Sequence, residues 1–332
     1  MVAVPVDFPD AAVAAEVLDG LIQVEESLAA TAHPDDELLT EASRHLIAAG
    51  GKRFRAMLVL LAAQFGDQKD PRVIPAAVAI ELTHLATLFH DDVMDEALVR
   101  RGHPSVNSRW NNSVAILTGD FLFARASAIL AGLGPEAVRI QAETFSRLVT
   151  GQMAETIGRR ADQDPLEFYL HVITEKTGSL IATAGRFGAL FAGAPEQIVN
   201  RIAAACEQIG VAWQLSDDVI DIASDSSQSG KTPGTDLRQG VRTLPVLYAL
   251  HSMAQSPAEV RLRWLLQEAD LTDEALLGEA LTLLRGHHAM KEARADVLTW
   301  AHGARTEIMA LPDVPARAAF LALCDFVEKR TG

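Results

Sequence analysis

Segments with helical hydrophobic periodicity cover almost the whole chain, and this pattern limits the fold more than any other feature. Alternating runs of Val, Ile and Thr are nearly absent, and aromatic residues make up only 5% of the 332 residues. Prolines stand where several of the helices would begin, as their preference for the first helical turn predicts. The pattern predicts helices over about 10–32, 36–49, 53–66, 71–98, 112–132, 135–160, 164–192, 195–225, 241–254, 256–269, 272–285, 287–310 and 314–330.

The expected architecture is one all-α domain over residues 1–332, built as a bundle of about 10–13 helices. Hydrophobic residues make up 49% of the chain, which is enough for a large core. No long linker or low-complexity tract divides it. Two polar loops rich in glycine interrupt the helices at 49–53 and 224–234, and the second is expected to be mobile.

The chain carries the same acidic signature twice, as DDVMD at 91–95 and DDVID at 217–221. Positions i and i+4 share a helix face, so each copy places two carboxylates about 6 Å apart along the axis. Carboxylates packed this densely in apolar flanks repel one another unless a cation lies between them. Oxygen-rich sites suit Mg²⁺, which completes its shell with water and substrate phosphates. The two signatures therefore predict chemistry on a diphosphate.

Basic residues accompany these motifs in a chain whose net charge is −15. Arginine grips phosphate oxygens with a bidentate fork, and lysine acts as a point charge. Each one alone would be an ordinary surface charge, but as a set with two acidic motifs they indicate phosphate binding. They are Lys52, Arg53, Arg55, Arg100, Arg101, Lys176 and Lys231.

The net charge also excludes some roles. A surface this acidic repels nucleic acid and disfavours strong adhesion to anionic lipid. Neither a signal peptide nor a charge-free run of about 18 apolar residues is visible, so we expect a cytoplasmic protein. The two cysteines, Cys206 and Cys324, have no metal-site spacing and are expected to be small buried residues.

Over about 40–245, the chain resembles the trans-isoprenyl diphosphate synthases of the polyprenyl synthetase family. The matching segments, in the family's order, are GGKRFR at 50–55, HLATLFHDDVMD at 84–95, RRG at 100–102, GD at 119–120, KTG at 176–178, QLSDDVID at 214–221 and GKTPGTDL at 230–237.

The resemblance implies the isoprenoid synthase fold, with helices around a deep central cavity. It also implies a Mg²⁺-dependent transferase, with about three ions per site, that condenses isopentenyl diphosphate with an allylic diphosphate and releases diphosphate. A homodimer is expected, and transient membrane contact for product release is left open.

The resemblance also implies roles, residue by residue. Asp91, Asp95 and Asp217 would hold Mg²⁺, and Asp221 joins this set directly or through water. Asp92 and Asp218 would support them. Arg100, Lys176 and Lys231 would bind the diphosphate of the allylic substrate. The residues that would bind the diphosphate of isopentenyl diphosphate are Lys52, Arg55, His84 and Arg101. Thr177 and Gln214 would line the path of the carbocation.

Product length is predicted from the residues one to two turns before Asp91. Ala86 and Thr87 are small where short-chain relatives carry an aromatic floor, so the resemblance implies a medium- or long-chain bacterial enzyme with a product of C30–C50. The resemblance implies that the growing chain runs down an apolar tunnel beneath the first acidic motif, and Leu82 and Phe121 are deeper residues that could still close this tunnel. A shorter-chain geranylgeranyl or farnesyl diphosphate synthase therefore stays open as an alternative.

Three positions depart from the family pattern without removing a charged site residue: Ala56 for proline, Asn111 for glycine, and Trp213 for phenylalanine or tyrosine.

Two further alternatives belong to other classes of protein. A terpene cyclase of class I would leave the second set of cations idle and would need more aromatic residues. A non-catalytic subunit of a heteromeric synthase would usually have lost acidic residues that are all present here.

Overall fold

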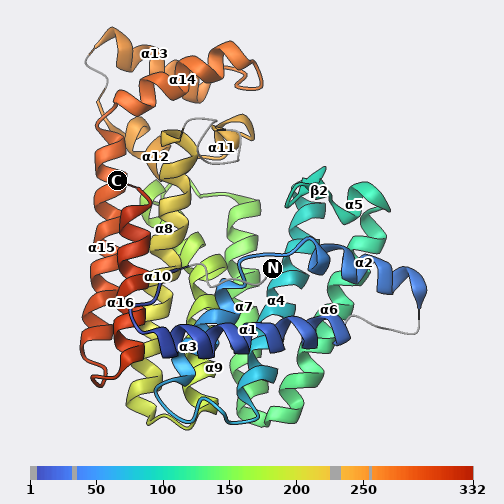
Figure 1. The fold of residues 1–332 in the computed structure, drawn as a ribbon. Coiled ribbons are helices and arrows are strands. Elements are labelled where there is room, and N and C mark those ends of the chain that lie inside the picture. The colour runs from blue at the N-terminus through green and yellow to red at the C-terminus, as the bar shows by residue number, and fades with distance from the viewer. Residues whose placement is uncertain (1–5, 32–35, 225–232, 254–255, 332) are drawn as a thin grey trace. The chain divides into compact units, whose positions relative to one another are not determined.

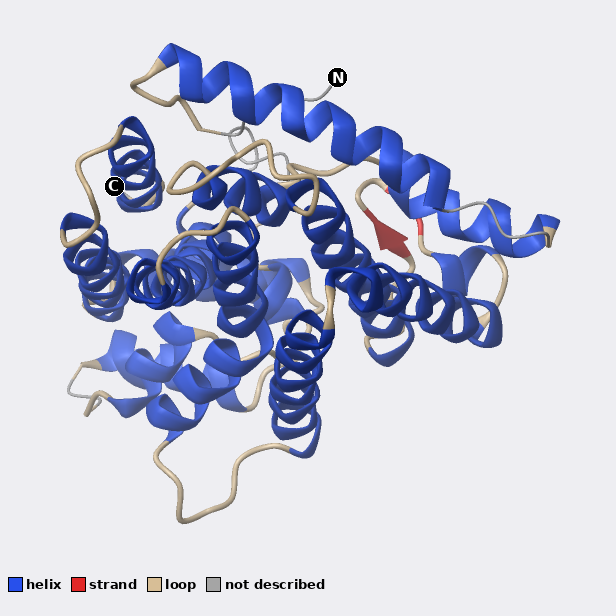
Figure 2. Ribbon diagram, turned by 90° about the horizontal axis from the view of Figure 1, so that it is seen from below, coloured by secondary structure: helices blue, strands red, loops and turns tan. Residues whose placement is uncertain are grey.

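The computed structural model describes residues 6–31, 36–224, 233–253 and 256–331, and it confirms the all-α class. Figure 2 colours most of the described chain as helix, with loops between the helices. Lys231, and with it most of the loop at 224–234 that the sequence predicts to be mobile, lies outside the described residues.

Each predicted helix except the one over 164–192 is present as a single helix, with ends that shift by a few residues. Local capping explains several of the starts. Asp164 accepts the backbone N–H groups of Leu166 and Glu167, with Pro165 in the first turn. Ser256 and Glu259 form a reciprocal capping box at the start of another helix.

The sequence missed three details. A short helix at Val106–Arg109 and another at Thr235–Arg238 were not predicted, and neither was the two-residue antiparallel pair of β1 (Val99–Arg100) and β2 (His103–Pro104). The predicted helix over 164–192 is instead α8 (Pro165–Ile173), the π-helical segment η1 (Thr174–Gly178) and α9 (Ser179–Phe191).

The chain divides into two compact units, and the boundaries between them fall inside helices. The single-domain expectation stays a prediction. Unit 1 comprises Met1–Ser146, Leu180–Cys206 and Glu307–Ala322, and unit 2 comprises Arg147–Ser179, Glu207–Thr306 and Leu323–Gly332.

Unit 1 is organised around α4, an apolar helix whose side chains are mostly buried, with α6 packed along it (Figure 1). Glycine allows one close backbone approach, because a Cβ on Gly188 of α9 would lie 2.0 Å from the carbonyl oxygen of Val59 in α3. The helices lying wholly in this unit are α1 (Ala11–Thr31), α2 (Glu37–Ala48), α3 (Phe54–Ala63), α4 (Val73–Met94), α5 (Val106–Arg109) and α6 (Asn112–Leu133).

Unit 2 has its own core, formed by leucine, valine and alanine side chains of α10 and the helices that follow it. The helices lying wholly in it are α8, α11 (Thr235–Arg238), α12 (Leu244–His251), α13 (Pro257–Gln267) and α14 (Glu274–Gly286). The helices that continue from one unit's residues into the other's include α7 (Pro135–Ile157), α10 (Glu196–Ala223), α15 (Ala289–Met309) and α16 (Pro315–Lys329).

Two helices, α4 and α6, are long and apolar enough to cross a membrane on length and composition alone. In α4, 67% of the qualifying window is buried inside the structure, and the helix contains Glu81. In α6 that share is 33%, and the helix carries Asp120 and Arg125. A core helix passes the same test, which accounts for α4.

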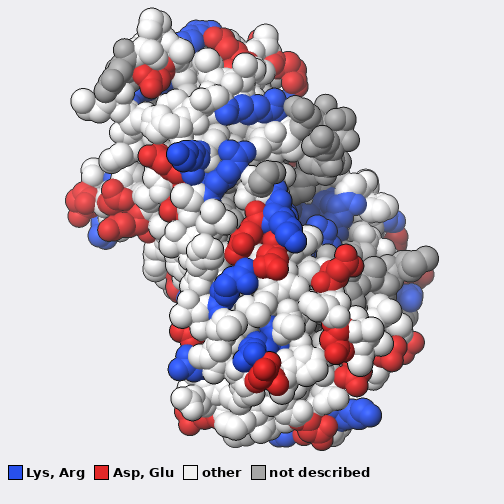
Figure 3. Space-filling model, turned by 60° about the vertical axis from the view of Figure 1, so that its left-hand side comes forward, with Lys and Arg blue, Asp and Glu red and all other residues white. Residues whose placement is uncertain are grey.

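The free thiols Cys206 and Cys324 are both buried, as expected. Burial raises the pKa of Cys324 to about 12. Figure 3 shows acidic and basic side chains interspersed over the face that it draws, so the negative charge does not gather in one block there.

Candidate active site

The first acidic motif lies at the C-terminal end of α4. Asp91 and Asp92 occupy the last turn, and Asp95 is the C-cap, its N–H bonding to the carbonyl of Asp91 at 2.8 Å. The carbonyl end of a helix carries partial negative charge, so three carboxylates here are electrostatically unfavourable without a cation. The predicted shared face of Asp91 and Asp95 therefore coincides with a place where positive charge is needed.

Arg100 provides part of that charge. Its Nε donates to Oδ1 of the buried Asp92 at 2.6 Å. Burial raises the pKa of Asp92, and Arg100 opposes that shift. Arg100 is held in place by the β1–β2 hairpin, whose central residues Arg101 and Gly102 both have positive φ, 53° and 77°. Such a pair is typical of a tight two-residue hairpin turn, which orients consecutive arginines differently.

Arg101 points from this hairpin to the loop between α2 and α3. Its guanidinium donates to the carbonyl oxygens of Gly50 and Leu46, the latter at 3.3 Å. A Cβ on Gly51 would meet the guanidinium at 3.1 Å, so glycine keeps this approach open. The contact brings two of the predicted phosphate-binding segments together, although they are about 50 residues apart in the chain.

Arg55 and His84 lie in the same electropositive region. Burial lowers the pKa of Arg55 to about 10, with Arg101 adding to the shift and Glu81 opposing it. The Arg55 Nε is buried and has no hydrogen-bond partner within the described part of the chain. Burial, and then Arg55 and the neighbouring arginines, hold the pKa of His84 well below its usual value. A bound anion would offset the free-energy cost of burying both side chains.

Arg53 has a different role from the one that its place in the motif indicates. Its guanidinium is buried and bonds to Glu25 at 2.5 Å and to the carbonyl of Ile47 at 3.2 Å, with Glu81 at 3.7 Å. Its φ of 45° places it in the left-handed region, where a bulky residue is rare. Arg53 therefore ties the start of α3 to α1 and α4.

The predicted chain-length residues lie on α4 and α6. Ala86 and Leu82 are fully buried, and the Thr87 hydroxyl donates to the carbonyl of His84 at 2.7 Å. Phe121 is partly buried on α6. Thr83, one turn below Ala86, was not among the residues predicted from the sequence.

Thr83 accepts a hydrogen bond from Nε2 of Gln141 on α7 at 2.8 Å, and both side chains are buried. The wall beneath the first motif therefore contains a polar bridge that the expectation of an apolar tunnel did not include.

The second acidic motif lies in the last two turns of α10, again at the carbonyl end of a helix. Asp217 and Asp221 are partly exposed, and Asp218 is buried. The carboxylate of Asp217 is bonded by Arg330, near the end of the chain. The repeated motif therefore recurs in a similar position on a second helix but with a different cationic partner.

Asp218 is held by neutral donors. The Tyr169 hydroxyl donates to it, Gln214 Nε2 donates at 3.3 Å, and the Leu244 N–H donates at 3.4 Å. Burial raises the pKa of Asp218 to about 7, and the hydrogen bond from Tyr169 opposes that shift. Gln214, predicted to line the carbocation path, is thus anchored by the acidic motif itself.

Asp221 organises the segment that follows the glycine-rich loop. Its two carboxylate oxygens accept the N–H groups of Thr235 and Asp236, each at 3.2 Å. Its carbonyl accepts the N–H of Gly234 at 2.9 Å. These bonds fit a supporting role for Asp221.

Lys176 and Thr177 lie in η1. The N–H of Ser179 bonds to the carbonyl of Thr174, five residues back, which marks an inserted residue in the helix. Such bulges occur frequently at functional sites. Lys176 Nζ lies 2.5 Å from a carboxylate oxygen of Glu155 on α7. A Cβ on Gly151 of α7 would lie 2.7 Å from the backbone nitrogen of Lys176, so glycine permits this packing.

A second group of potential metal ligands, Glu259, His287 and His288, lies in unit 2. Nδ1 of His287 accepts the N–H of Ala289 at 3.2 Å, so its proton sits on Nε2, the nitrogen that faces Glu259 at 4.0 Å. A metal on Nε2 would need the opposite tautomer. Glu259 is also engaged in its capping box, and the group is therefore better explained as a link between helices.

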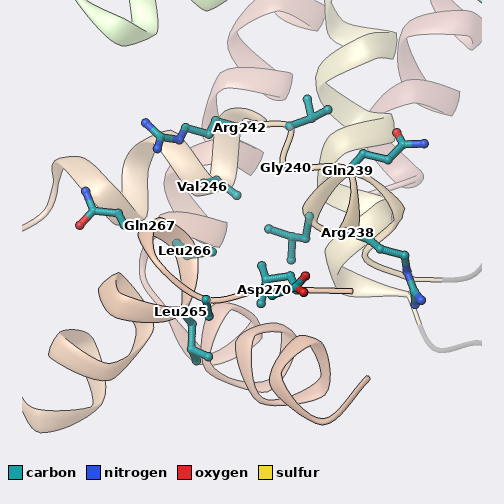
Figure 4. A pocket seen from close by; sticks show the side chains of 13 residues that line it. Arg238, Gln239, Gly240, Arg242, Val246, Leu265, Leu266, Gln267 and Asp270 are labelled. Carbon is teal, nitrogen blue, oxygen red and sulfur yellow. The ribbon is translucent and has the colours of Figure 1, made fainter. Parts of the chain in front are cut away.

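A pocket of about 340 Å³ lies elsewhere in unit 2, between α11, α12 and the loop from α13 to α14. Arg238 and Arg242 flank it but point away from each other (Figure 4). Arg238 bonds to Glu274 at 2.6 Å, and Asp270 accepts hydrogen bonds from Thr272. The pocket therefore lacks polar groups that converge on one ligand.

Comparison with known proteins decides the family. The family model described as polyprenyl synthetase matches residues 36–284. The chain belongs to the polyprenyl synthetase family. It is 50% identical to a nonaprenyl diphosphate synthase of Mycobacterium tuberculosis (strain ATCC 25618 / H37Rv) over 328 residues, 98% of this chain and 97% of that one. It is 43% identical to a dimethylallyltranstransferase of the same organism over 312 residues, 94% of each.

A comparison with solved structures supports the same assignment at the level of the fold. A solved geranylgeranyl pyrophosphate synthase from Corynebacterium glutamicum, complexed with calcium and isoprenyl diphosphate, is 44% identical. The TM-score is 0.88, over 98% of this chain and 100% of the other. The predictions of the family, the isoprenoid synthase fold and a prenyl-transferring enzyme of a metal-dependent family are thereby confirmed.

Within the polyprenyl synthetase pattern, each of the three departures has a structural explanation. The Ala56 N–H, which proline would lack, donates to Glu81 at 3.0 Å. Asn111 is the N-cap of α6 and accepts the Val114 N–H at 2.9 Å. The ring of Trp213 stacks on Phe326 at 5.8 Å between ring centroids, with the guanidinium of Arg330 beside it.

Proposed function

We propose that this polyprenyl synthetase is a Mg²⁺-dependent synthase that condenses isopentenyl diphosphate with an allylic diphosphate to make a linear all-trans product of C30–C50. The observation that carries the proposal is the partly buried pair of guanidinium groups of Arg55 and Arg101, with the neutral His84 beside them, next to an acidic helix end. An enzyme that handled a single diphosphate would have no use for it.

In unit 1, Arg55 and Arg101 bind the diphosphate of isopentenyl diphosphate, with Lys52 and His84. The buried Nε of Arg55, which has no hydrogen-bond partner among the described residues, supports this assignment. His84 is held neutral, so it donates one hydrogen bond without adding charge. Arg100 binds the allylic diphosphate while keeping its bond to Asp92.

In unit 2, Lys176 binds the allylic diphosphate, as does Lys231, which lies outside the described residues. Binding there requires Lys176 to exchange its bond to Glu155 for phosphate oxygens. Thr177 and Gln214 line the path of the carbocation, and the bond between Gln214 and Asp218 fixes the direction of the amide.

The carboxylates fit a hard divalent cation, because both sets crowd at the carbonyl ends of helices, where negative charge is least stable. Asp91, Asp95 and Asp217 would hold Mg²⁺, with Asp92, Asp218 and Asp221 in support. When bound, Mg²⁺ stabilises the negative charge on the departing diphosphate as a Lewis acid.

The reaction begins when the allylic C–O bond breaks, which leaves diphosphate and a delocalised cation. Arg100 and Lys176 stabilise the charge that develops on the leaving group. The double bond of isopentenyl diphosphate attacks the cation, and a proton then passes to the released diphosphate. Water must be excluded at this stage, because it would otherwise convert the cation to an alcohol.

The small side chains of Ala86 and Thr87 support the long product. The same feature leaves a shorter product as the second candidate, because Thr83 and Gln141 form a bridge one turn deeper. The C. glutamicum neighbour, a geranylgeranyl pyrophosphate synthase by name, favours this second candidate.

We also propose a cytoplasmic homodimer. In unit 1, α6 exposes Ile116 and Leu117, and α7 exposes Val138 and Phe145. Large exposed apolar side chains on neighbouring elements mark association surfaces, and a two-fold pair is the commonest arrangement. Sedimentation of wild type and of Leu117→Glu tests it: the substitution should shift the protein toward the monomer.

A product assay tests the proposed activity. Purified protein is incubated with Mg²⁺, labelled isopentenyl diphosphate and, in turn, dimethylallyl, geranyl, farnesyl or geranylgeranyl diphosphate. Dephosphorylated products are then sized by chromatography. A ladder that ends at thirty or more carbons supports the proposal in full. An end at fifteen or twenty carbons selects the shorter-chain candidate, and no condensation with any primer selects the non-catalytic subunit.

A further inference from the structure

The end of the chain folds back onto the second acidic motif. Arg330 follows α16 directly, and its guanidinium donates to Oδ1 of Asp217 and, at 2.9 Å, to the hydroxyl of Ser216. The guanidinium carbon lies 4.1 Å from the ring centroid of Trp213, which stacks on Phe326. Only 17% of the Arg330 side chain is exposed. We call this set of five residues the terminal clamp.

The clamp provides a counter-ion where the motif needs one. Asp217 lies one residue from Asp218 and one turn from Asp221, at the carbonyl end of α10. A guanidinium held against an aromatic face gains cation–π attraction in addition to its ion pair. Asp217 Oδ2 accepts no hydrogen bond within the described residues, so one carboxylate oxygen stays open. Arg330 thus stands as a cation beside the carboxylate proposed to hold Mg²⁺.

We infer that Arg330 is a built-in counter-ion that competes with the divalent cation for Asp217. The inference rests on the proposed function, because it takes Asp217 as a metal ligand. A guanidinium in contact with the carboxylate repels an arriving dication, so the two cations oppose each other. The opposition is reciprocal by linkage: a dication on Asp217 weakens the clamp and loosens the end of α16.

The opposite role predicts the opposite sign. If Arg330 only oriented Asp217 as a ligand, its loss would weaken metal binding roughly 10–100-fold, as loss of a supporting partner typically does. If Arg330 competes, its loss leaves a more negative cluster and metal binding tightens. Metal affinity in the absence of substrate therefore separates the two roles.

The experiment is a calorimetric titration of Mn²⁺ into the full chain without substrate. The variants are Arg330→Met, which keeps an apolar side chain against Trp213, and Arg330→Lys, which keeps the charge. Arg305→Met is the matched control, because Arg305 forms ion pairs with Asp325 and Glu328 on α16 in the same unit. We expect about tenfold tighter binding for Arg330→Met, wild-type binding for Arg305→Met, and an affinity between these two for Arg330→Lys.

A double-mutant cycle with Asp217→Asn locates the effect. Competition requires the gain from Arg330→Met to disappear when Asp217 is already neutral. A gain that persists in that background overturns the inference, as does unchanged or weaker binding in Arg330→Met. Circular dichroism checks that each variant is folded.

Failure of the inference can be told from failure of the proposed function. Wild type that neither binds Mn²⁺ nor condenses substrates overturns the proposed function, and the inference with it. Wild type that does both, with Arg330→Met unchanged in Mn²⁺ affinity, overturns the inference alone.

Discussion

The two acidic helix ends share a motif but differ in what surrounds it. At the end of α4, the middle aspartate, Asp92, is paired with the guanidinium of Arg100. At the end of α10, the equivalent Asp218 is held by a phenol, an amide and a backbone N–H, and its pKa rises to about 7. The outer Asp217 takes the guanidinium instead. The same five-residue pattern therefore specifies a place on a helix, and the neighbours decide how its charge is compensated.

The strongest test of this comparison removes one outer carboxylate from each motif. Asp91→Ala and Asp217→Ala should each lower the condensation rate by at least about 100-fold, because each removes a group that stabilises the departing diphosphate through the metal. Steady-state assays at saturating Mg²⁺ measure this. Glu136→Gln is the control, an exposed carboxylate paired with Arg139. A full rate in either aspartate variant would remove that motif from the reaction.

The second prediction separates the substrates. Arg55→Met should raise KM for isopentenyl diphosphate roughly 10–100-fold, the usual cost of a hydrogen bond to a charged group. Lys176→Met should do the same for the allylic primer only. Arg55→Lys should recover little, because an ammonium lacks the planar fork. If each variant shifted both KM values equally, the division of the two diphosphates between these cations would be wrong.

The third prediction concerns the wall beneath the first motif. Ala86→Phe should shorten the product, because an aromatic ring would fill the space next to Thr87 and Thr83. Overpacking costs about 1–3 kcal/mol, so thermal unfolding must accompany the product sizing. Thr87→Val, which keeps the size of the side chain and loses only its hydrogen bond to the carbonyl of His84, should leave the length distribution unchanged. The same chain length in Ala86→Phe and wild type would contradict the tunnel assignment.

The smallest effect is a pH dependence that comes from the neutral His84 beside the arginines of the first motif. His84 has a pKa below 6.5 in the folded protein, so below that pH the unfolded chain takes up a proton that the folded chain does not. Its contribution to stability is therefore present at neutral pH and falls as the pH drops, by at most about 1.4 kcal/mol per unit. His84→Gln should flatten the decline in Tm between pH 7.5 and 5.5. An unchanged slope would show that folding does not lower the pKa of His84.

The local features of this fold were readable in the sequence. Helices beginning at Pro135, Pro165, Pro257 and Pro315 start where proline and its flanking caps predict. The acidic motifs were placed correctly at helix positions because the spacing of Asp91 and Asp95 matches one turn. These signals depend only on neighbours within a few residues.

Partners far apart in the chain were not readable. Arg53 forms ion pairs with Glu25 and Glu81, whereas Arg55 forms no ion pair with them. Nothing in the motif at 50–55 distinguishes the two arginines. Tyr169 and Arg330 reach the second motif from 49 and 113 residues away. Such pairs depend on the packing of whole helices, which a single sequence does not encode locally.

The π-helical turn at η1 has a consequence for how the chain can change over evolutionary time. One extra residue in a helix advances everything after it by about 100°. Deleting a residue from 174–178 would restore a regular α-helix but turn the buried Ala184 and Phe187 of α9 away from their present neighbours. Losing the extra residue would therefore require compensating substitutions around Ala184 and Phe187, and it would also change the direction of Lys176 and Thr177.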